Sequence, residues 1–303
     1  MKTELRKFTT ETRNPDTMNL DQMTPLEIVT AMNREDRKVP EAVEKCLPQI
    51  AELVSAVEKA FMEGGRLFYM GAGTSGRLGV LDASECPPTY GVPAEMVVGL
   101  IAGGDIALRN PVEGAEDDRT LGRKDLEERN LTAKDVVVGI AASGRTPYVL
   151  GGFEYAKSLG CVTAAVSCNV GSAIGQAADI AIEAEVGPEV LTGSTRLKSG
   201  TAQKMILNMI TTASMVRIGK AYQNLMIDVV QSNEKLHTRA ENIAMDATGV
   251  SREEARRAID EAGGSVKLAV TMLLAECDVE TARGLLEKSR GHVREAIQSI
   301  SRR

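Results

Sequence analysis

Apolar residues along the chain change from helical spacing to short continuous runs, and this pattern predicts an α/β fold. From Pro40 to Gly64 they recur every three or four positions, which predicts one helix ending at Gly64-Gly65. Strands are then expected near 66–70, 95–101, 135–140, 161–167 and 179–184. Helices are expected near 75–84, 115–127, 146–158, 171–177 and 196–219. Because continuous apolar strands separated by helices are typical of a covered parallel sheet, we predict a doubly wound five-stranded α/β domain.

The two ends of the chain have different patterns. Residues 1–45 are polar and predict an arm with short helices around 25–33. Beyond residue 237 the strand pattern is absent, and a repeat with a 27-residue offset begins. Its members are Ala255, Ile259, Gly264, Val266 and Ala269, which recur as Ala282, Leu286, Gly291, Val293 and Ala296. The spacing in each unit predicts a helix, a glycine turn and a second helix. Residues 240–303 should therefore form a small helical domain, in addition to an α/β domain over residues 46–235.

Composition and charge argue against several classes of protein. The net charge is −6, aromatic residues make up 3% and Trp is absent, so a nucleic-acid partner is not expected. The two histidines, His237 and His292, lie far apart, and no C-x-x-C pair occurs, so we expect no metal site and no disulfide framework. The scattered cysteines are Cys46, Cys86, Cys161, Cys168 and Cys277. With no apolar stretch that could span a membrane, a cytoplasmic protein is expected.

Two loops with similar sequences follow predicted strands. Residues 71–77 read Gly-Ala-Gly-Thr-Ser-Gly-Arg, and residues 139–146 read Gly-Ile-Ala-Ala-Ser-Gly-Arg-Thr. Glycine permits close backbone approach, a helix start favours negative charge, and Ser75, Ser143 and Thr146 add hydroxyl donors. The two loops therefore predict an anion site, most simply for a phosphate.

Two other interpretations of these loops stay open. Residues 71–76 fit the dinucleotide pattern G-x-G-x-x-G, but the next predicted strand ends in Ala102-Gly103-Gly104 without the expected acid. Both loops can also be plain tight turns. Arg77 and Arg145 occupy equivalent places, and an arginine in a first helical turn is more often solvated than bound to a ligand.

Carboxylates are the obvious acid and base groups in a chain with so few histidines. Glu85 precedes Pro87-Pro88, and these prolines predict the end of a helix with Glu85 in an extended or turn conformation. Glu116 lies in an acidic run, which by itself is typical of a solvated helix start. Spacing alone does not select these two from 42 acidic residues.

A third polar segment, residues 189–204, opens the long predicted helix. Glu189, Ser194 and Lys198 are candidate sugar contacts. The alternative is a well-capped core helix, because the apolar positions that follow have the spacing of a packed face.

Several of these motifs resemble the sugar isomerase (SIS) domain family, whose members bind phosphosugars. Ser75 lies in the matching first loop, and Ser143, Gly144 and Thr146 match the latter part of its S-x-S-G-x-T loop. The chain departs from that pattern at Ala141, where many members carry serine. Longer blocks resemble one branch, the etherases acting on N-acetylmuramic acid 6-phosphate. These blocks are 10–14, 81–91, 113–117, 139–147, 193–204, 224–230 and 233–236.

The resemblance implies a reaction and roles for residues. It implies a cofactor-free lyase that releases D-lactate from C3 of the sugar, in cell-wall amino sugar recycling. Glu85 matches the family's general acid, Glu116 matches the second acid/base residue, and Ser75, Ser143, Gly144 and Thr146 would hold the 6-phosphate. It also implies a homodimer and a ubiquitin-associated-like helical tail. The alternatives are an SIS aldose–ketose isomerase and a non-catalytic sugar-phosphate sensor.

Overall fold

The computed structural model describes residues 8–231 and 234–301, so Asn233 of the resembling block 233–236 lies outside the described residues. The chain divides into two compact units. The larger comprises residues 1–84 and 95–211, and the smaller comprises 85–94 and 212–303.

A five-stranded parallel sheet forms the centre of the larger unit. Its strands are β1 (Leu67–Gly71), β2 (Val97–Ile101), β3 (Val136–Ile140), β4 (Val162–Ser167) and β5 (Ile180–Glu183). The strand order is β2-β1-β3-β4-β5, and every pairing is parallel. All residues of β1 and β3 are buried, as expected of central strands covered on both faces. The predicted fold class is therefore confirmed.

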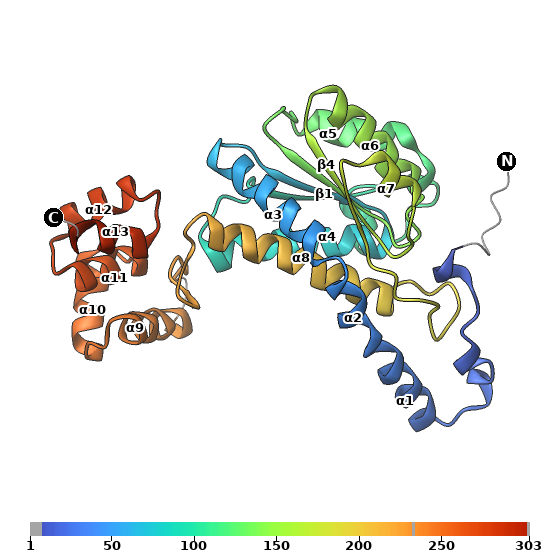
Figure 1. The fold of residues 1–303 in the computed structure, drawn as a ribbon, viewed down its shortest axis with the longest axis horizontal. Helices are drawn as coiled ribbons and strands as arrows, with labels where there is room; N and C mark the ends of the chain where they lie inside the picture. The colour runs from blue at the N-terminus through green and yellow to red at the C-terminus, as the bar shows by residue number, and fades with distance from the viewer. Residues whose placement is uncertain (1–7, 232–233, 302–303) are drawn as a thin grey trace. The chain divides into compact units, whose positions relative to one another are not determined.

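Helices cover both faces of this sheet (Figure 1). On one face lie α5 (Arg119–Glu128), α6 (Pro147–Ser158) and α7 (Ala173–Ala177). On the other lie α3 (Leu47–Met62), α4 (Gly73–Tyr90) and α8 (Lys198–Arg217). Phe68 and Met70 share a buried cluster with Phe153 of α6, whereas the Tyr69 hydroxyl donates to the carbonyl of Leu207 in α8. Successive strand residues thus reach opposite helix layers.

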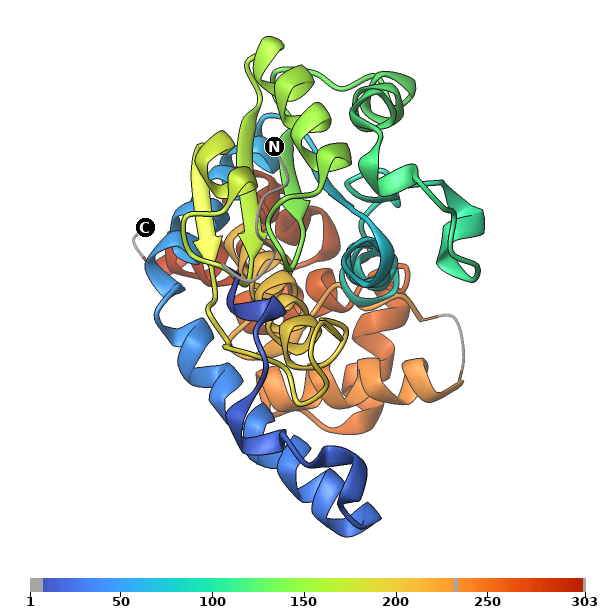
Figure 2. The same ribbon diagram turned by 90° about the vertical axis from the view of Figure 1, so that its right-hand side faces the viewer.

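The N-terminal segment is packed rather than extended. It forms short 3-10 turns at Thr9–Glu11, Pro15–Thr17 and Leu20–Gln22, followed by α1 (Pro25–Asp36) and α2 (Lys38–Glu44). In Figure 2, α1 extends away from the sheet. The side-chain amide of Asn14 donates to the carbonyl of Pro188 at 3.2 Å, and the Thr17 hydroxyl donates to that of Val190 at 2.9 Å. These bonds tie the segment to the chain beyond β5.

Three predicted helix boundaries are wrong. The single helix expected over 40–64 is two helices, α2 and α3, because Pro48 lacks the N–H that a continuous helix would donate to Glu44. The helix expected from 115 begins at Arg119, since the carboxylate of Asp118 accepts from the N–H of Thr120 at 2.8 Å and caps α5 there. Residues 115–117 form a separate 3-10 turn.

The third error concerns the paired prolines. Helix α4 does not end near residue 84 but includes Pro87 and Pro88 and runs to Tyr90. The helix keeps both prolines in its last turn, where φ is compatible with the ring, although each proline lacks an N–H donor and crowds the preceding turn. The helix ends at Gly91, which has φ +61° and donates its N–H to Pro87. Glu85 is accordingly helical and exposed, not extended.

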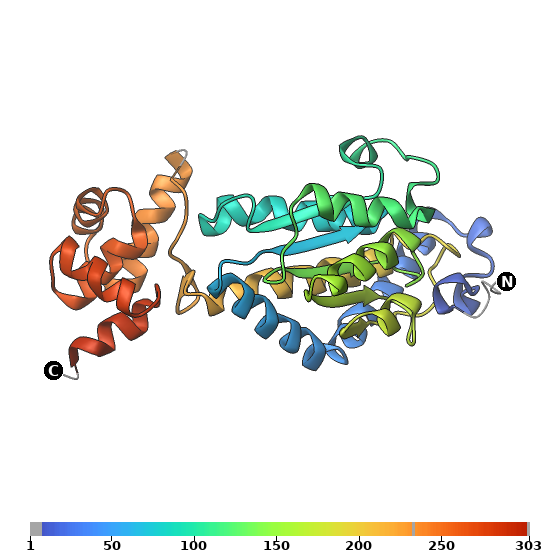
Figure 3. The same ribbon diagram turned by 90° about the horizontal axis from the view of Figure 1, so that it is seen from above.

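The smaller unit is mainly helical. It contains a hairpin of two short strands, β6 (Ala221–Tyr222) and β7 (Leu225–Met226), which the sequence pattern did not indicate. Its helices are α9 (Glu234–Thr248), α10 (Arg252–Glu261), α11 (Val266–Ala275), α12 (Val279–Lys288) and α13 (Val293–Ser301), which pack together in Figure 3. Equivalent repeat positions, such as Ala255 and Ala282, are buried in one core. Across the described residues, no helix is long and apolar enough to cross a membrane.

Candidate functional site

The two predicted anion loops leave the same edge of the sheet. Strands β1 and β3 are adjacent and parallel, and Gly71 lies opposite Ile140 in the register. Both loops therefore begin at the carboxyl ends of neighbouring strands, where open α/β sheets bind ligands.

The second loop opens onto a cavity of about 570 Å³, within the usual range for a small-molecule site. Ser143, Thr146 and Glu116 all line it, so three of the predicted site residues meet there. The other lining residues are Phe8, Asp117, Arg145, Pro147, Gly171, Ala173 and Gln176. The start of α6, the turn containing Glu116 and the loop before α7 thus surround one space.

The hydroxyl groups of this loop are available to a ligand. Thr146 is the N-cap of α6, yet its side chain makes no capping hydrogen bond. Throughout residues 8–231 and 234–301, neither Ser143 nor Thr146 has a hydrogen-bond partner for its hydroxyl. Together with the partial positive charge at the start of α6, they form a favourable anion site.

Gly144 gives the loop its backbone conformation. Its φ is +71°, and a Cβ there would lie 2.2 Å from the Cβ of Ser172. Its carbonyl accepts the N–H of Ile174 at 3.0 Å. Only glycine fits this close approach, which aligns the loop with the segment before α7.

The serine hydroxyl of the first loop, unlike those of the second loop, already binds a protein side chain. Ser75 is buried in the first turn of α4, and its hydroxyl donates to the side-chain oxygen of Gln203 at 3.0 Å. It is not among the residues that line the cavity at the second loop. A phosphate-binding role for Ser75 stays a prediction.

The two predicted carboxylates lie in different units. Glu116 is exposed in a 3-10 turn of the larger unit, at the cavity. Glu85 is exposed on the part of α4 that belongs to the smaller unit. Their pairing across a substrate stays a prediction.

The third polar segment forms a buried, capped helix start. The carboxylate of Glu189 accepts from the N–H groups of Lys198 and Ser199 at 3.1 and 2.9 Å. It also accepts from the Ser199 hydroxyl at 2.8 Å. The Lys198 ammonium lies 2.7 Å from Glu35, and Ser194 is half-buried in the preceding turn. Sugar contacts by Glu189, Ser194 and Lys198 stay a prediction.

The N-terminal segment contributes a residue to the cavity that sequence reasoning missed. The Thr9 hydroxyl donates to the side-chain oxygen of Asn169 at 3.0 Å. The Asn169 amide in turn donates to the Thr10 hydroxyl and to the carbonyl of Ala142, at 3.1 and 3.0 Å. These bonds hold Phe8 at the cavity. The only indication in the sequence was that residues 10–14, next to Phe8, resemble the etherases.

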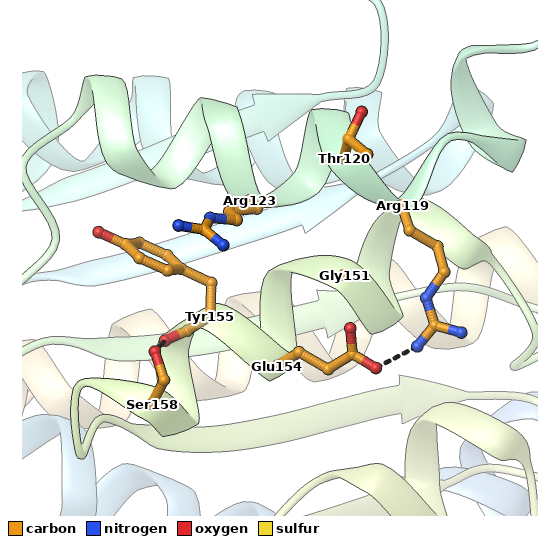
Figure 4. Close-up of a pocket in the computed structure, with 7 residues that line it drawn as sticks. All are labelled: Arg119, Thr120, Arg123, Gly151, Glu154, Tyr155 and Ser158. Carbon is orange, nitrogen blue, oxygen red and sulfur yellow. Dashed lines mark hydrogen bonds and ion pairs between the residues drawn. The ribbon is translucent and has the colours of Figure 1, made fainter.

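A second cavity, of about 400 Å³, lies between α5 and α6 and contains none of the predicted residues (Figure 4). Arg119 pairs with Glu154, and the Arg123 guanidinium lies 5.5 Å from the centre of the Tyr155 ring. Its charged groups therefore contact each other on an exposed helix surface. We consider it a weaker candidate site.

Buried acids near the sheet also have defined partners. Asp82 of α4 accepts from the side-chain amide of Asn208 at 2.7 Å and from the Thr211 hydroxyl at 3.2 Å. Burial raises the pKa of Asp82 above its ordinary value. Among the residues described, no group of three His, Cys, Asp or Glu side chains is arranged to hold a metal ion.

Comparisons with known proteins agree with the SIS resemblance. Residues 49–157 match the glucokinase regulatory protein N-terminal SIS domain, and residues 124–213 match the SIS domain. The chain is 60% identical to an N-acetylmuramic acid 6-phosphate etherase of Actinobacillus pleuropneumoniae, over 97% of both chains. It is 59% identical to one of Rhizobium rhizogenes, over 98% of this chain and 96% of that protein.

Two solved structures that match the fold are more distant in sequence. A phosphoheptose isomerase from Francisella tularensis aligns with 64% of this chain and 100% of its own, at 17% identity and a TM-score of 0.49. One from Neisseria gonorrhoeae aligns with 63% of this chain and 98% of its own, at 17% identity and a TM-score of 0.47.

Proposed function

Since the chain belongs to the N-acetylmuramic acid 6-phosphate etherase family, we propose that it removes the C3 lactyl group of that sugar phosphate. The products are N-acetylglucosamine 6-phosphate and D-lactate. The observation that carries the proposal is a cavity where a carboxylate meets two hydroxyls of the second loop that have no partner among the described residues. The hydroxyls suit the phosphate, and the carboxylate suits proton transfer.

The phosphate would be held by Ser143 and Thr146 at the start of α6. Gly144 keeps the loop in the conformation that presents both hydroxyls. This anchoring fixes the far end of the sugar, so C2 and C3 are presented to a catalytic group at a constant distance.

Elimination is the chemically accessible route to cleave this ether. Ring opening exposes an aldehyde at C1, which makes the C2 hydrogen acidic. Glu116 removes that proton as a general base, and Glu85 protonates the lactate oxygen as it leaves C3. Water then adds to the resulting double bond, with its oxygen at C3 and a proton at C2. One water molecule is consumed for each lactate released, and no redox step is involved.

The biological setting of the proposal is the catabolism of cell-wall amino sugars in the cytoplasm. The proposal includes a homodimer, as expected of SIS proteins. Light scattering on the purified chain measures this directly, and a monomer at micromolar concentration would contradict the dimer.

Lactate release from N-acetylmuramic acid 6-phosphate tests the activity. The wild-type chain should release one lactate per sugar, whereas Glu116→Gln should lower kcat by about 10²- to 10⁴-fold, the usual contribution of general acid–base catalysis. Glu113→Gln is the matched control, because Glu113 is an exposed member of the same acidic run that does not line the cavity. Equal rates for wild type and Glu116→Gln would contradict the assignment. A ketose product without lactate would indicate an isomerase instead.

A further inference from the structure

The two loops carry arginines at equivalent positions, and the structure gives them opposite surroundings. Arg77 donates from Nε to the carbonyl of Leu108 at 2.8 Å and from Nη2 to that of Ala107 at 2.7 Å. It therefore holds the turn that follows β2. Arg145 makes no hydrogen bond or ion pair with any described residue, and its Nε is buried.

Arg145 is nevertheless held in a defined place. Its guanidinium carbon lies 4.9 Å from the centre of the Phe8 ring, at a distance where a cation and an aromatic face attract each other. Phe8 is in turn anchored through the bonds of Thr9 and Thr10 to Asn169. Such stacking orients the planar guanidinium but leaves its charge and its N–H donors unmatched.

The unmatched charge faces the proposed substrate site. Arg145 lines the same cavity as Glu116, Ser143 and Thr146. A cation without a protein partner in a partly enclosed space favours an anionic ligand. N-acetylmuramic acid 6-phosphate has two anionic groups, the phosphate and the carboxylate of the lactyl substituent.

We propose that Arg145 binds the lactyl carboxylate and is thereby the residue that distinguishes the muramic acid substrate from its glucosamine product. This inference rests on the proposed function. The phosphate already has hydroxyl donors and the start of α6, whereas the planar guanidinium matches a carboxylate with two parallel hydrogen bonds. The lactyl group is attached at C3, next to the C2 atom assigned to Glu116, so its carboxylate belongs in the cavity that Glu116 lines.

The contact also bears on the chemical step. As the C3–O bond breaks, negative charge develops on the lactate oxygen, close to the carboxylate of the same fragment. A fixed guanidinium there stabilises this developing charge, which is absent from the bound substrate, until Glu85 has protonated the oxygen and lactate leaves as a monoanion. Arg145→Met should therefore lower kcat as well as raise KM.

A binding cycle tests the proposal. Three ligands are titrated by calorimetry: N-acetylmuramic acid 6-phosphate, its analogue with the lactyl carboxylate converted to a carboxamide, and N-acetylglucosamine 6-phosphate. The proteins carry Glu116→Gln to prevent turnover, with or without Arg145→Met. Conversion to the amide should weaken binding at least about tenfold when Arg145 is present, and about twofold or less when it is absent. The glucosamine product should bind both proteins within about twofold.

Arg77→Met is the matched control, since it removes the same side chain from the first loop. It should change the affinities for substrate and amide by the same factor. Arg145→Lys, which keeps the charge but not the planar pair of donors, should give an intermediate preference. Thermal melting of each variant identifies any that fail to fold.

Two results would overturn the inference. If Arg145→Met weakens the binding of N-acetylglucosamine 6-phosphate as much as the binding of the substrate, the arginine contacts the phosphate. If the amide and the acid bind alike with Arg145 present, no group in the cavity recognises the carboxylate. Neither result depends on turnover, whereas absence of lactate from the wild-type reaction would refute the proposed function itself.

Discussion

Lys198 forms a buried ion pair with Glu35, so a structural role of Lys198 can be tested separately from its predicted contact with the sugar. The ammonium of Lys198 lies 2.7 Å from Oε2 of Glu35, and their side chains are 1% and 3% exposed. The pair joins the first residue of α8 to the last turn of α1. Burial raises the pKa of Glu35, but its hydrogen bonds to Lys198 and Lys38 outweigh that effect and hold the pKa below 4.5.

Replacing Lys198 with Met leaves the Glu35 carboxylate buried without its main partner. Such a change costs about 3–5 kcal/mol of unfolding free energy, and the lower end applies because Lys38 still lies 2.7 Å from Glu35. A loss of about 3 kcal/mol lowers Tm by roughly 6–12 °C in a chain of this size. The double variant Glu35→Met/Lys198→Met leaves no buried charge unpaired, since Lys38 is half exposed, and it should recover most of that loss.

Thermal melting at several pH values, with KM for the sugar phosphate, provides the measurement. Because the folded pKa of Glu35 is lowered, the pair's contribution is full above 4.5 and is lost as pH falls through the folded pKa. The difference in Tm between wild type and Lys198→Met should shrink in that acidic range. An unchanged Tm with a KM raised tenfold or more would refute this reasoning and indicate a sugar contact instead.

Two further substitutions test the amino end of β3 and the second loop. Asp135→Asn should lower the unfolding free energy by about 3 kcal/mol, since Asp135 is buried and accepts from Nη2 of Arg66 at 2.8 Å. Burial raises the pKa of Asp135, but the bonds from Arg66 and nearby N–H groups outweigh this effect and hold the pKa below its ordinary value. The wild type should therefore lose this stability as pH falls below about 3.8, as measured by circular dichroism during an acid titration. Gly144→Ala should weaken binding of N-acetylglucosamine 6-phosphate tenfold or more by calorimetry, because the added Cβ would lie 2.2 Å from Ser172. Gly249→Ala is the control, because Gly249 has a similar positive φ but no atom near the position of an added Cβ. Equal effects of the two substitutions on binding would contradict the steric argument.

Most of the α/β layout could be predicted because its strands are short apolar runs. The run Val136–Ile140 is buried at every position, and such a run has few alternatives to a central strand. Two of the three errors in helix boundaries arose at prolines. At Pro48 a missing N–H separates two helices, whereas Pro87 and Pro88 lie within one. Sequence shows the missing donor but not whether packing keeps the helix intact.

The candidate site was less predictable because contacts over long sequence separations decide it. Ser75 and Gln203 are bonded across a separation of 128 residues, which assigns the Ser75 hydroxyl to a protein partner. The loop sequences around Arg77 and Arg145 are nearly the same, yet among the described residues only Arg77 donates to backbone carbonyls. Spacing along the chain contains no information on such partners.

The central claim is that Glu116, in the cavity of the second loop, removes the C2 proton so that lactate leaves by elimination. Proton NMR of the sugar product formed in deuterated water tests it most directly. The wild-type chain should yield N-acetylglucosamine 6-phosphate with deuterium at C2, in step with lactate release, and Glu116→Gln should yield almost none of either. Lactate released with the original hydrogen retained at C2 would contradict the account.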